Sequence, residues 1–589
     1  MPYVLIMYST ILYMMFAKMS ILVYNNKIFL DLKMRILGIS PAHDASVCVL
    51  NNGEVEFFFK EERYSEIKKD NLPFLSIVKV YENLKGKIDR CVIGSPSPSD
   101  SYFHSLEIFV QKLFKCPVDR FCYHHHLQHA ALAFENSNFD KSLVFVIDRN
   151  GSNIGNGLRE SETAIIARKN PYSLVEIYKN FWASSFGETV DNVIDQFLSQ
   201  INKDNEDCNF VCKSSFNTTK VYETATSLIS EHPLNNGKTM GLSSYGKFRK
   251  EFPDLFRKSL SSEEYLIPND SYLSHRKRNY AEVEVSVFSD LDNMSTSDLN
   301  ESNHELYADY AYHVQTQTQK EILNFIRAFV EKTKIKNVVL TGGYAMNIVA
   351  NSFYVKELPD VNFFFEPMAD DTGNSIGASI LLYKQISNDL NNHKIKNTFI
   401  HGVKHSLNGI DGKDCSVLDI VELLKNQKSV AVFNGLSESG QRALGNRSIL
   451  FDARNKNAKD LVNKIKKREW YRPFAAIVLE EDCNVYFDML GLEKSEYMTN
   501  SFDVMNEYKD KLPGIVHVDG SCRVQTIDKN SHLYELIIQF KKETGVGLLL
   551  NTSFNLSGYP LVETPEQAIK TLYESDLDHV WFPEIKKVL

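Results

Sequence analysis

The chain has 589 residues, enough for about two to four domains. Apolar residues make up 43% and charged residues 24%, which excludes a disordered or fibrous protein. The net charge of −9 and the isoelectric point near 6.0 exclude a surface built to coat nucleic acid, so we expect no nucleic-acid partner. The nine cysteines are dispersed, apart from Cys208 and Cys212, which lack the second pair of a zinc site. Dispersed thiols of this kind predict a cytoplasmic protein.

Residues 1–33 form an apolar extension ahead of the first strand pattern. Within it, residues 3–24 are apolar enough to imitate a membrane span and carry Lys18 as their only charge. Met34 looks like a natural start, because the strand pattern "RILGIS" follows at once. We favour an upstream start codon over a signal anchor, and we expect no membrane contact unless the extension belongs to the mature protein.

Strand patterns alternate with helical patterns over the first 400 residues. The segments 45–50 and 54–59 flank an Asn-Gly pair and predict a β-hairpin. Residues 307–334 keep helical periodicity for several turns without Gly or Pro. Isolated apolar strands are predicted at 35–40, 90–95, 142–148 and 337–343. Alternation of this kind, opened by an antiparallel meander, predicts an α/β fold.

A polar stretch at 387–397 precedes a new α/β pattern that contains a strand at 429–435. We therefore place a domain boundary near residue 400, between a first domain of residues 34–400 and a second of residues 401–589. No internal repeat is visible in the sequence.

Four of the sixteen histidines fall within six positions, 124 to 129. His125 and His129 are four residues apart and would share one face of a helix, a spacing that can hold one metal ion. The zinc-protease motif H-E-x-x-H has a glutamate after its first histidine, whereas this chain has His126, so that activity lacks its general base. Taken alone, the pair is as typical of a core-lining or solvated helix face as of a metal site.

Two aspartates make the metal hypothesis sharper. Asp148 ends a buried-type strand, and Asp371 heads a glycine-rich turn into a helix. Two imidazoles with carboxylates suit Fe(II), Mn or Zn and leave positions open for a substrate. Asp371 could equally be a helix N-cap, and the sequence alone does not separate the two roles.

Two glycine-punctuated loops favour nucleotide binding. The segment 340–347 reads as a strand, the pair Gly342 and Gly343, and a helix start, where the backbone can approach a phosphate. The segment 237–247 is a second such loop and carries lysine. A lone Gly-Gly pair would indicate only a tight turn, but two such loops beside a metal-ligand set favour a nucleotide.

The second half of the chain concentrates cations in turn-rich segments. Guanidinium groups bind phosphate and carboxylate through two hydrogen bonds at once. Any one of these arginines would more often form a surface ion pair, worth at most about 1 kcal/mol. Because several occur in an otherwise acidic protein, we interpret them as one polyanion site. The cations and their polar neighbours are Arg442, Arg447, Lys466, Arg468, Arg472, Arg523, Ser553 and Asn555.

A set of short segments stands in one order along the chain: "HDAS", "EER", "HHLQHA", "MGLSSYG", "TGGYAMN", "GQRALGNRSIL", "KKREWYRPFA", "HVDGSCRVQ" and "NTSFNLSG". In these segments, and over residues 34–589, the chain resembles the NodU/CmcH/TobZ family of O-carbamoyltransferases. Each segment is modest alone, and together they are highly specific. The chain departs from the family at 148–152, where "DRNGS" replaces an acidic "DGxGE" loop, and at Gln441, where proline is customary.

This resemblance implies a fold and a metal site. The first domain would have the actin-like (ASKHA) ATPase-type fold, related to the enzyme that installs threonylcarbamoyl on tRNA, and the second would be a smaller YrdC-like α/β domain. The implied metal is Fe(II), with Mn or Zn as alternatives, and Mg²⁺ could accompany ATP. The implied metal ligands are His125, His129, Asp148 and Asp371.

The resemblance also implies binding and catalytic residues. Gly342, Gly343 and Asn347 would lie against a nucleotide in the first domain. In the second domain, carbamoyl phosphate and ATP would contact Lys466, Arg472, Ser553 and Asn555. Further phosphate ligands would be Arg442, Arg447 and Arg523. His43 and Asp44 would lie near the acceptor, with His43 as a candidate base. The implied catalytic residues are thus His43, Asp44, Lys466 and Arg472.

The resulting hypothesis is an ATP-dependent O-carbamoyltransferase that forms carbamoyl adenylate and then carbamoylates a hydroxyl of a small-molecule acceptor. The acceptor would be sugar-containing or another secondary metabolite, and a homodimer is compatible with the resemblance. One alternative is threonylcarbamoyl transfer to tRNA, which the acidic charge balance disfavours. The other is a catalytically silent nucleotide-binding regulator, which the changed loop at 148–152 keeps open.

Overall fold

The computed structural model describes residues 34–41, 43–94, 101–155, 158–182, 212–214, 218–230, 235–252, 255, 304–387, 393, 395 and 398–589. The apolar extension at residues 1–33 and Cys208 lie outside the described residues. In the part of the chain that the structure describes, none of the helices combines the length and apolar character needed to cross a membrane.

The N-terminal domain opens with a five-stranded sheet in the order β3-β2-β1-β4-β5. Its strands are β1 (Arg35–Ser40), β2 (Ser46–Asn51), β3 (Glu54–Lys60), β4 (Arg90–Ile93) and β5 (Val118–Arg120). β1, β2 and β3 are antiparallel, whereas β4 and β5 run parallel to β1. The predicted hairpin joins β2 to β3, where Asn52 and Gly53 both have positive φ, at 50° and 85°. Asn-Gly suits such a turn, because both residues tolerate the left-handed region.

The second sheet repeats the strand order of the first. β8 is antiparallel to β6 and β9 is antiparallel to β8, whereas β11 and β12 run parallel to β6. Its strands are β6 (Lys141–Ile147), β7 (Asn153–Gly155), β8 (Leu158–Lys169), β9 (Tyr172–Trp182), β10 (Cys212–Ser214), β11 (Asn337–Thr341) and β12 (Asn362–Phe365). The order β9-β8-β6-β11-β12 matches β3-β2-β1-β4-β5 one for one. This duplication is the hallmark of the actin-like fold, so the predicted α/β class and the implied actin-like domain are both confirmed.

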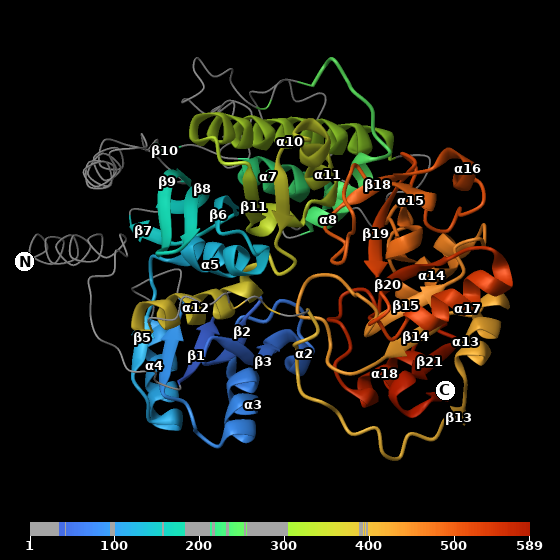
Figure 1. The fold of residues 1–589 in the computed structure, drawn as a ribbon, viewed down its shortest axis with the longest axis horizontal. Helices are drawn as coiled ribbons and strands as arrows, with labels where there is room; N and C mark the ends of the chain where they lie inside the picture. Colours follow the sequence, from blue (N-terminus) through green and yellow to red (C-terminus); the bar gives the residue numbers. More distant parts are fainter. Residues whose placement is uncertain are drawn as a thin grey trace, which may run out of the picture.

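Helices lie on both faces of the two sheets. Those of the N-terminal domain are α2 (Glu61–Ser65), α3 (Phe74–Leu84), α4 (Ser101–Phe114), α5 (His125–Ser137), α7 (Thr218–Ser230), α8 (Asn236–Ser243), α10 (Glu305–Thr333), α11 (Ile348–Glu357) and α12 (Asn374–Ile386). Figure 1 shows α3 and α4 below the first sheet, α7 and α10 above the second, and α5 and α12 between the two sheets. The predicted helix over 307–334 is α10, which begins two residues earlier and ends one residue earlier.

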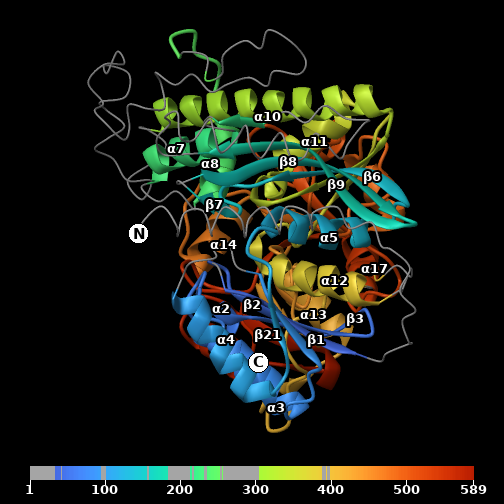
Figure 2. The ribbon, with the colours of Figure 1, turned by 90° about the vertical axis from the view of Figure 1, so that its left-hand side faces the viewer.

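The two central helices are exchanged between the repeats. α5 ends the first repeat but packs on β6 and β11 of the second sheet, whereas α12 ends the second repeat but packs on β1, β2 and β4 of the first. The two helices also pack on each other, and Figure 2 shows them stacked between the sheets. Residues that begin α5 and α12 are therefore brought close to the ends of β1 and β6.

Glycines permit this close packing. A Cβ atom on Gly377 of α12 would lie 2.0 Å from the carbonyl oxygen of Gln128 on α5. A Cβ atom on Gly38 of β1 would lie 2.1 Å from the carbonyl oxygen of Ser375. Because both obstacles are backbone atoms, any side chain at either position would push α12 away from its neighbours.

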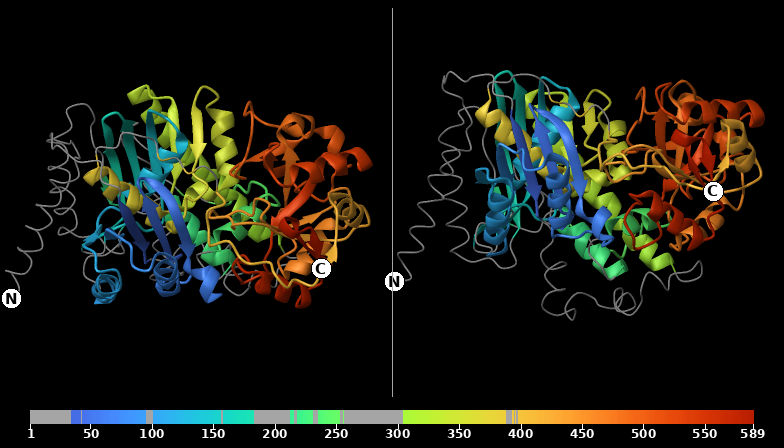
Figure 3. Two further views of the ribbon diagram at one scale, coloured as in Figure 1. Left: turned by 60° about the horizontal axis from the view of Figure 1, so that its bottom comes forward. Right: turned by 90° about the horizontal axis from the view of Figure 1, so that it is seen from below.

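The C-terminal domain contains a ten-stranded mixed sheet in the order β13-β22-β21-β14-β15-β20-β16-β19-β18-β17. Its strands are β13 (Lys413–Asp414), β14 (Val430–Phe433), β15 (Arg447–Phe451), β16 (Ala475–Leu479), β17 (Phe487–Asp488), β18 (Ser501–Val504), β19 (Ser521–Ile527), β20 (Leu548–Ser553), β21 (His579–Phe582) and β22 (Lys587–Val588). Its helices are α13 (Val417–Lys425), α14 (Ala458–Lys466), α15 (Cys483–Tyr486), α16 (Asn506–Lys509), α17 (Tyr534–Thr544) and α18 (Pro565–Tyr573). In both views of Figure 3 this orange and red domain stands beside the blue-to-yellow N-terminal domain.

Buried polar contacts join the two domains at α2. Arg63 of α2 donates hydrogen bonds to the carbonyl oxygen of Glu438, at 3.1 Å, and to Oγ of Ser437, at 3.3 Å. His401 is fully buried, accepts from the Lys60 backbone N–H at 2.8 Å and places Nδ1 2.9 Å from a Glu563 carboxylate oxygen. Since each buried group has a partner in the other domain, these contacts fix how the domains meet.

We expect Gly377→Ala to destabilise the protein. Alanine favours a helix over glycine by up to about 1 kcal/mol, but the clash with Gln128 forces α5 and α12 apart, and overpacking costs typically about 1–3 kcal/mol. Gln385→Ala, near the end of the same helix, is the matched control. Thermal unfolding should show a lower midpoint for the Gly377 variant alone. Equal midpoints for the two variants would contradict the close approach described above.

Candidate functional site

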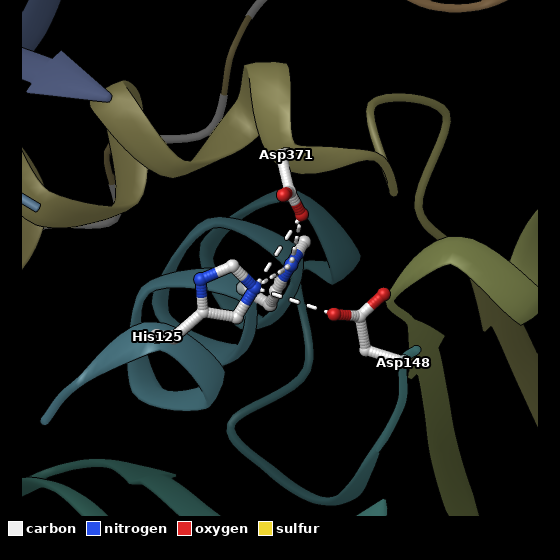
Figure 4. Close-up of side chains that lie close together, drawn as sticks. His125, Asp148 and Asp371 are labelled. Atoms are coloured by element: carbon white, nitrogen blue, oxygen red, sulfur yellow. Dashed lines mark hydrogen bonds and ion pairs between the residues drawn. The ribbon is translucent and has the colours of Figure 1, made fainter. Parts of the chain in front are cut away.

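Four predicted metal ligands converge between the two sheets. Four donor atoms lie within 4.8 Å of one another, one each from His125, His129, Asp148 and Asp371. All four residues are at most 6% exposed. His125 Nε2 is 3.2 Å from His129 Nε2, 3.3 Å from Asp148 Oδ2 and 3.4 Å from Asp371 Oδ1. Figure 4 shows the His125 ring facing both carboxylates.

The duplicated fold explains this convergence. Asp148 directly follows β6, the first strand of the second repeat, and His125 begins α5. Asp371 lies in the 3₁₀ turn η4 (Asp371–Gly373) that leads into α12. The exchange of α5 and α12 brings the start of each helix to the other repeat's first strand. The donors thus come from three separate elements, held by the packing of both repeats.

The donor set is strongly anionic. Burial opposes protonation of His125, but Asp371 and Asp148 outweigh burial and raise its pKa to about 10. Burial likewise opposes ionisation of Asp371 and Asp148, yet the histidines keep the pKa of both carboxyls far below their ordinary values. The two carboxylates therefore favour a positive charge beside them, which either a protonated imidazole or a bound cation can supply. Two imidazole nitrogens with two carboxylate oxygens fit a divalent transition-metal ion, so these residues could hold one.

His43 and Asp44 lie beside this donor set, in the turn between β1 and β2. His43 Nδ1 is 3.2 Å from Asp371 Oδ2 and 3.6 Å from Asp44 Oδ2. Oδ1 of Asp371 therefore faces His125 and His129, whereas Oδ2 faces His43. Burial lowers the pKa of His43, but Asp371 and Asp44 outweigh burial and raise it. Burial, and then the neighbouring Asp370, raise the pKa of Asp44 to about 6.

The glycine loop supports the donor set directly. The Gly343 N–H donates to Asp148 Oδ1 at 3.1 Å. Gly342 has φ of 84°, and a Cβ atom there would lie 2.6 Å from the Ile147 carbonyl oxygen, so close packing against β6 requires glycine. Asn347 caps α11 by accepting from the Ala350 N–H at 3.1 Å. These contacts account for the three residues without a ligand, and their role against a nucleotide stays a prediction.

A second cluster lies in the C-terminal domain, around the buried Lys466 at the end of α14. Its ammonium group donates to Oγ of Ser553 and to Oδ1 of Asn555, both at 3.0 Å. Burial and the nearby charges of Arg468 and Arg472 hold the pKa of Lys466 well below its ordinary value. The structure therefore brings together three residues that lie up to 89 positions apart in the chain.

Arginines surround this lysine. Burial lowers the pKa of Arg442, and the charges of Arg523 and Arg472 lower it further. Burial, followed by the charges of Arg472 and Arg523, also lowers the pKa of Arg468. Burial lowers the pKa of Arg523 to about 10. Within the described residues, no carboxylate forms an ion pair with Arg442, Arg468 or Arg523. Closely spaced cations without carboxylate partners form a site for a polyanion such as a phosphate ester.

Arg447 stands apart from this cluster. It is fully buried, and its Nη atoms donate to the carbonyl oxygens of Asn434, at 2.7 Å, and Gly435, at 3.1 Å. Its guanidinium carbon lies 3.7 Å from the centre of the Phe433 ring. Backbone acceptors and an aromatic ring thus surround the Arg447 guanidinium group, and its role as a phosphate ligand stays a prediction.

One residue beside the donor set, Asn374, was not among the expected site residues. Asn374 places Nδ2 3.2 Å from His129 Nε2 and 3.5 Å from His125 Nε2. Asn374 stands three residues after Asp371, so the two side chains lie on the same side of the helical turn. This spacing is the feature of the sequence that places Asn374 near the donor set. Arg468 belongs to the cationic cluster, and its position in "KKREWYRPFA" placed it among the cations but gave no sign of its contact with Asn463, at 2.6 Å.

Two family models match the chain. Carbamoyltransferase N-terminus matches residues 100–380, and Carbamoyltransferase C-terminus matches residues 421–586. Together these ranges contain the four converging donors and the cationic cluster. The fold and the two sites thus define a two-domain carbamoyl-transferring enzyme. The chain belongs to the carbamoyltransferase family and is a carbamoyltransferase.

Several curated proteins are similar to the chain over long stretches. An uncharacterized protein of Methanocaldococcus jannaschii is 27% identical over 562 residues, which cover 92% of this chain and 97% of that protein. Nodulation protein NolO of Bradyrhizobium diazoefficiens is 26% identical over 472 residues, or 77% and 76% of the two chains. Nodulation protein NolNO of Sinorhizobium fredii is 33% identical over 289 residues, or 46% and 42%. The resemblance to the NodU-type family is confirmed.

Solved structures give weaker matches. Full-length HypF in its phosphate- and nucleotide-bound form is 11% identical, with a TM-score of 0.36 over 62% of this chain and 57% of that chain. Component A of the Acidaminococcus fermentans (R)-2-hydroxyglutaryl-CoA dehydratase is 15% identical, with a TM-score of 0.29 over 60% and 99%. Scores this low do not define the fold, which follows from the duplicated sheet topology instead.

Replacing a converging donor should abolish metal binding. We expect about one divalent ion per chain in the wild-type protein, and close to none in His125→Ala or Asp371→Ala, because removing one ligand leaves an incomplete site. Elemental analysis of the purified proteins measures this. His104→Ala is the control, because His104 is exposed on α4. A full metal content in both site variants would contradict the assignment.

Proposed function

We propose that the protein is an ATP-dependent O-carbamoyltransferase that divides its reaction between the two sites. The cationic cluster would form carbamoyl adenylate from carbamoyl phosphate and ATP. The donor set between the sheets would then transfer the carbamoyl group to a hydroxyl of a sugar-containing or other small-molecule acceptor. The observation that carries this proposal is the pairing, within one carbamoyltransferase, of an anionic donor set and a separate cationic cluster, in which Arg442, Arg468 and Arg523 have no carboxylate partner among the described residues.

In the first step the cations bind the phosphate oxygens of carbamoyl phosphate and ATP. Water cleaves carbamoyl phosphate into carbamate and phosphate. A carbamate oxygen attacks the α-phosphorus of ATP, the bond to the bridging oxygen breaks, and pyrophosphate leaves with the electron pair. Arg442, Arg472 and Arg523 stabilise the negative charge that develops on the phosphate oxygens, and their positions are fixed before reaction. Lys466 is oriented by Ser553 and Asn555 and adds a further donor.

In the second step the acceptor oxygen attacks the carbamoyl carbon of the adenylate. The bond between that carbon and the AMP phosphate oxygen breaks, and AMP leaves. His43 is placed to take the hydroxyl proton: its Nδ1 faces Asp371 at 3.2 Å, which leaves Nε2 as the base. Asp44, at 3.6 Å, also orients the ring.

The metal would be held by His125, His129, Asp148 and Asp371. Fe(II) is the proposed ion, Mn or Zn are alternatives, and Mg²⁺ could accompany ATP. When bound, such an ion supplies Lewis-acid polarisation of a carbonyl oxygen. The Gly343 N–H holds Asp148 in place, and Asn374 contacts both imidazoles, so the chain fixes the geometry of its donors.

The two steps should separate by mutation. With carbamoyl phosphate and ATP, the wild-type protein should release pyrophosphate and form carbamoyl adenylate. Lys466→Ala should lower the rate of pyrophosphate release by about 100-fold or more, the usual effect of removing one transition-state donor. Lys464→Ala is the control, because Lys464 lies on the same helix and its side chain is exposed.

His125→Ala tests the second step. It should still release pyrophosphate, because the cationic cluster is intact, but no acceptor from a panel of sugars and other metabolites should gain the mass of one carbamoyl group. The absence of both pyrophosphate and adenylate from the wild-type protein would overturn the proposal. So would carbamoylation of an acceptor by His125→Ala at the wild-type rate.

A further inference from the structure

Arg472 differs from the other arginines of the cationic cluster because it has a carboxylate neighbour. Its Nη1 lies 3.6 Å from Oε2 of Glu469, and its backbone N–H donates to the Glu469 carbonyl oxygen at 3.3 Å. A carboxylate and a phosphate accept hydrogen bonds from the same N–H groups of a guanidinium, so Glu469 competes with any phosphate for Arg472. The affinity of this arginine for an anion therefore depends on how closely Glu469 engages it.

A lysine of the N-terminal domain holds this glutamate. Lys238 of α8 places Nζ 2.6 Å from Oε1 of Glu469, and the two side chains are only 22% and 16% exposed. Burial opposes ionisation of Glu469, but the hydrogen bond from Lys238 and the charge of Arg472 outweigh burial and lower its pKa. The carboxylate is thus charged, and it contacts Lys238 more closely than it contacts Arg472.

The packing of α8 against the C-terminal domain fixes the place of Lys238. His517 Nε2 lies 3.2 Å from the carbonyl oxygen of Gly241, three residues after Lys238. A Cβ atom on Gly241 would lie 3.2 Å from Cδ of Pro473, the residue that follows Arg472, so the helix and this segment are in close contact. Figure 1 shows α8 on the side of the N-terminal domain that faces the C-terminal domain. The backbone that carries Lys238 is therefore held against the backbone that carries Arg472.

The first turn of α8 also lies near the Arg472 guanidinium group itself. A Cβ atom on Gly237, the neighbour of Lys238, would have Arg472 Nη2 as its nearest contact, at 4.0 Å. Nη1 of Arg472 thus faces the carboxylate that Lys238 holds, and Nη2 faces the start of α8. The glycine-punctuated loop at 237–247 therefore reaches the cationic cluster of the other domain, where its lysine can act on the cluster through Glu469.

We propose that Lys238 is a positioning residue for the first step, which engages Glu469 and so leaves the Arg472 guanidinium group available to bind a substrate phosphate. This inference rests on the proposed function, which places carbamoyl phosphate and ATP in the cationic cluster. Without Lys238, Glu469 would pair closely with Arg472 and offset its charge, since opposite charges near a protein surface attract more strongly than in bulk water. The site of the first step thus requires a residue of the other domain.

The first measurement is the affinity of the cluster for an anion. Isothermal titration calorimetry with pyrophosphate, in buffer free of divalent metal, reports this affinity without turnover. Lys238→Met keeps a side chain of similar length and removes the charge. Its dissociation constant for pyrophosphate should rise about tenfold, as expected when one charge-assisted hydrogen-bonding group is lost. Lys238→Arg should bind pyrophosphate like the wild-type protein, because it keeps the charge that engages Glu469.

A double variant separates positioning from support of the fold. Glu469→Gln removes the competing charge, so the double variant Lys238→Met/Glu469→Gln should recover most of the wild-type affinity. If Lys238 only supported the packing of this region, the double variant would bind pyrophosphate no more tightly than Lys238→Met. Lys247→Ala is the matched control, because Lys247 lies in the same loop, is exposed and pairs with Glu305 at 3.5 Å.

The rate of pyrophosphate release from carbamoyl phosphate and ATP, measured on the same proteins, separates this inference from the proposed function. At low substrate concentration the rate should fall about tenfold in Lys238→Met, in line with its weaker anion binding, and recover in the double variant. Wild-type binding and release in Lys238→Met, or no recovery in the double variant, would overturn the positioning role and leave the proposed function standing. If the wild-type protein releases no pyrophosphate, the proposed function fails, and the role of Lys238 in the first step fails with it.

Discussion

The crossing of α5 and α12 is the contact on which the N-terminal site depends. Each helix ends one repeat of the duplicated fold and packs on the sheet of the other, so each delivers its first residues to the partner repeat. Gly377 allows the helices to meet backbone to backbone. The donors His125 and Asp371 lie at the starts of these helices, and a small change in the crossing would move them relative to Asp148. The packing of α5 against α12 in the core therefore also fixes the geometry of the donor set.

The two sites have opposite charge, and the structure links them along two paths. Arg442 of the cationic cluster donates to the Met346 carbonyl oxygen at 3.1 Å, in the same glycine loop whose Gly343 N–H holds Asp148. The second path is α2, whose Arg63 donates to the carbonyl oxygen of Glu438 at 3.1 Å. A reaction that makes an anion at one site and consumes it at the other benefits from such links, because released intermediate is lost to water.

The sequence predicted the strands and the long helix well, because apolar runs and Asn-Gly turns are local signals. It did not show the duplication, since two copies of a topology can share strand order without sharing residues. It also could not separate an N-cap from a metal ligand at Asp371, or a packing arginine from a phosphate ligand at Arg447. Those roles depend on contacts such as Arg447 with Phe433 and the carbonyl oxygen of Asn434, which tertiary structure alone creates.

We propose that residues from three elements of the duplicated fold bind one metal ion. X-ray absorption at the edge of the bound metal tests it most directly. The account predicts first-neighbour scattering from nitrogen and oxygen atoms, with the outer-shell pattern of two imidazoles, and the loss of one imidazole in His129→Ala. Sulfur neighbours, or a spectrum with no imidazole that stays the same in His129→Ala, would contradict it.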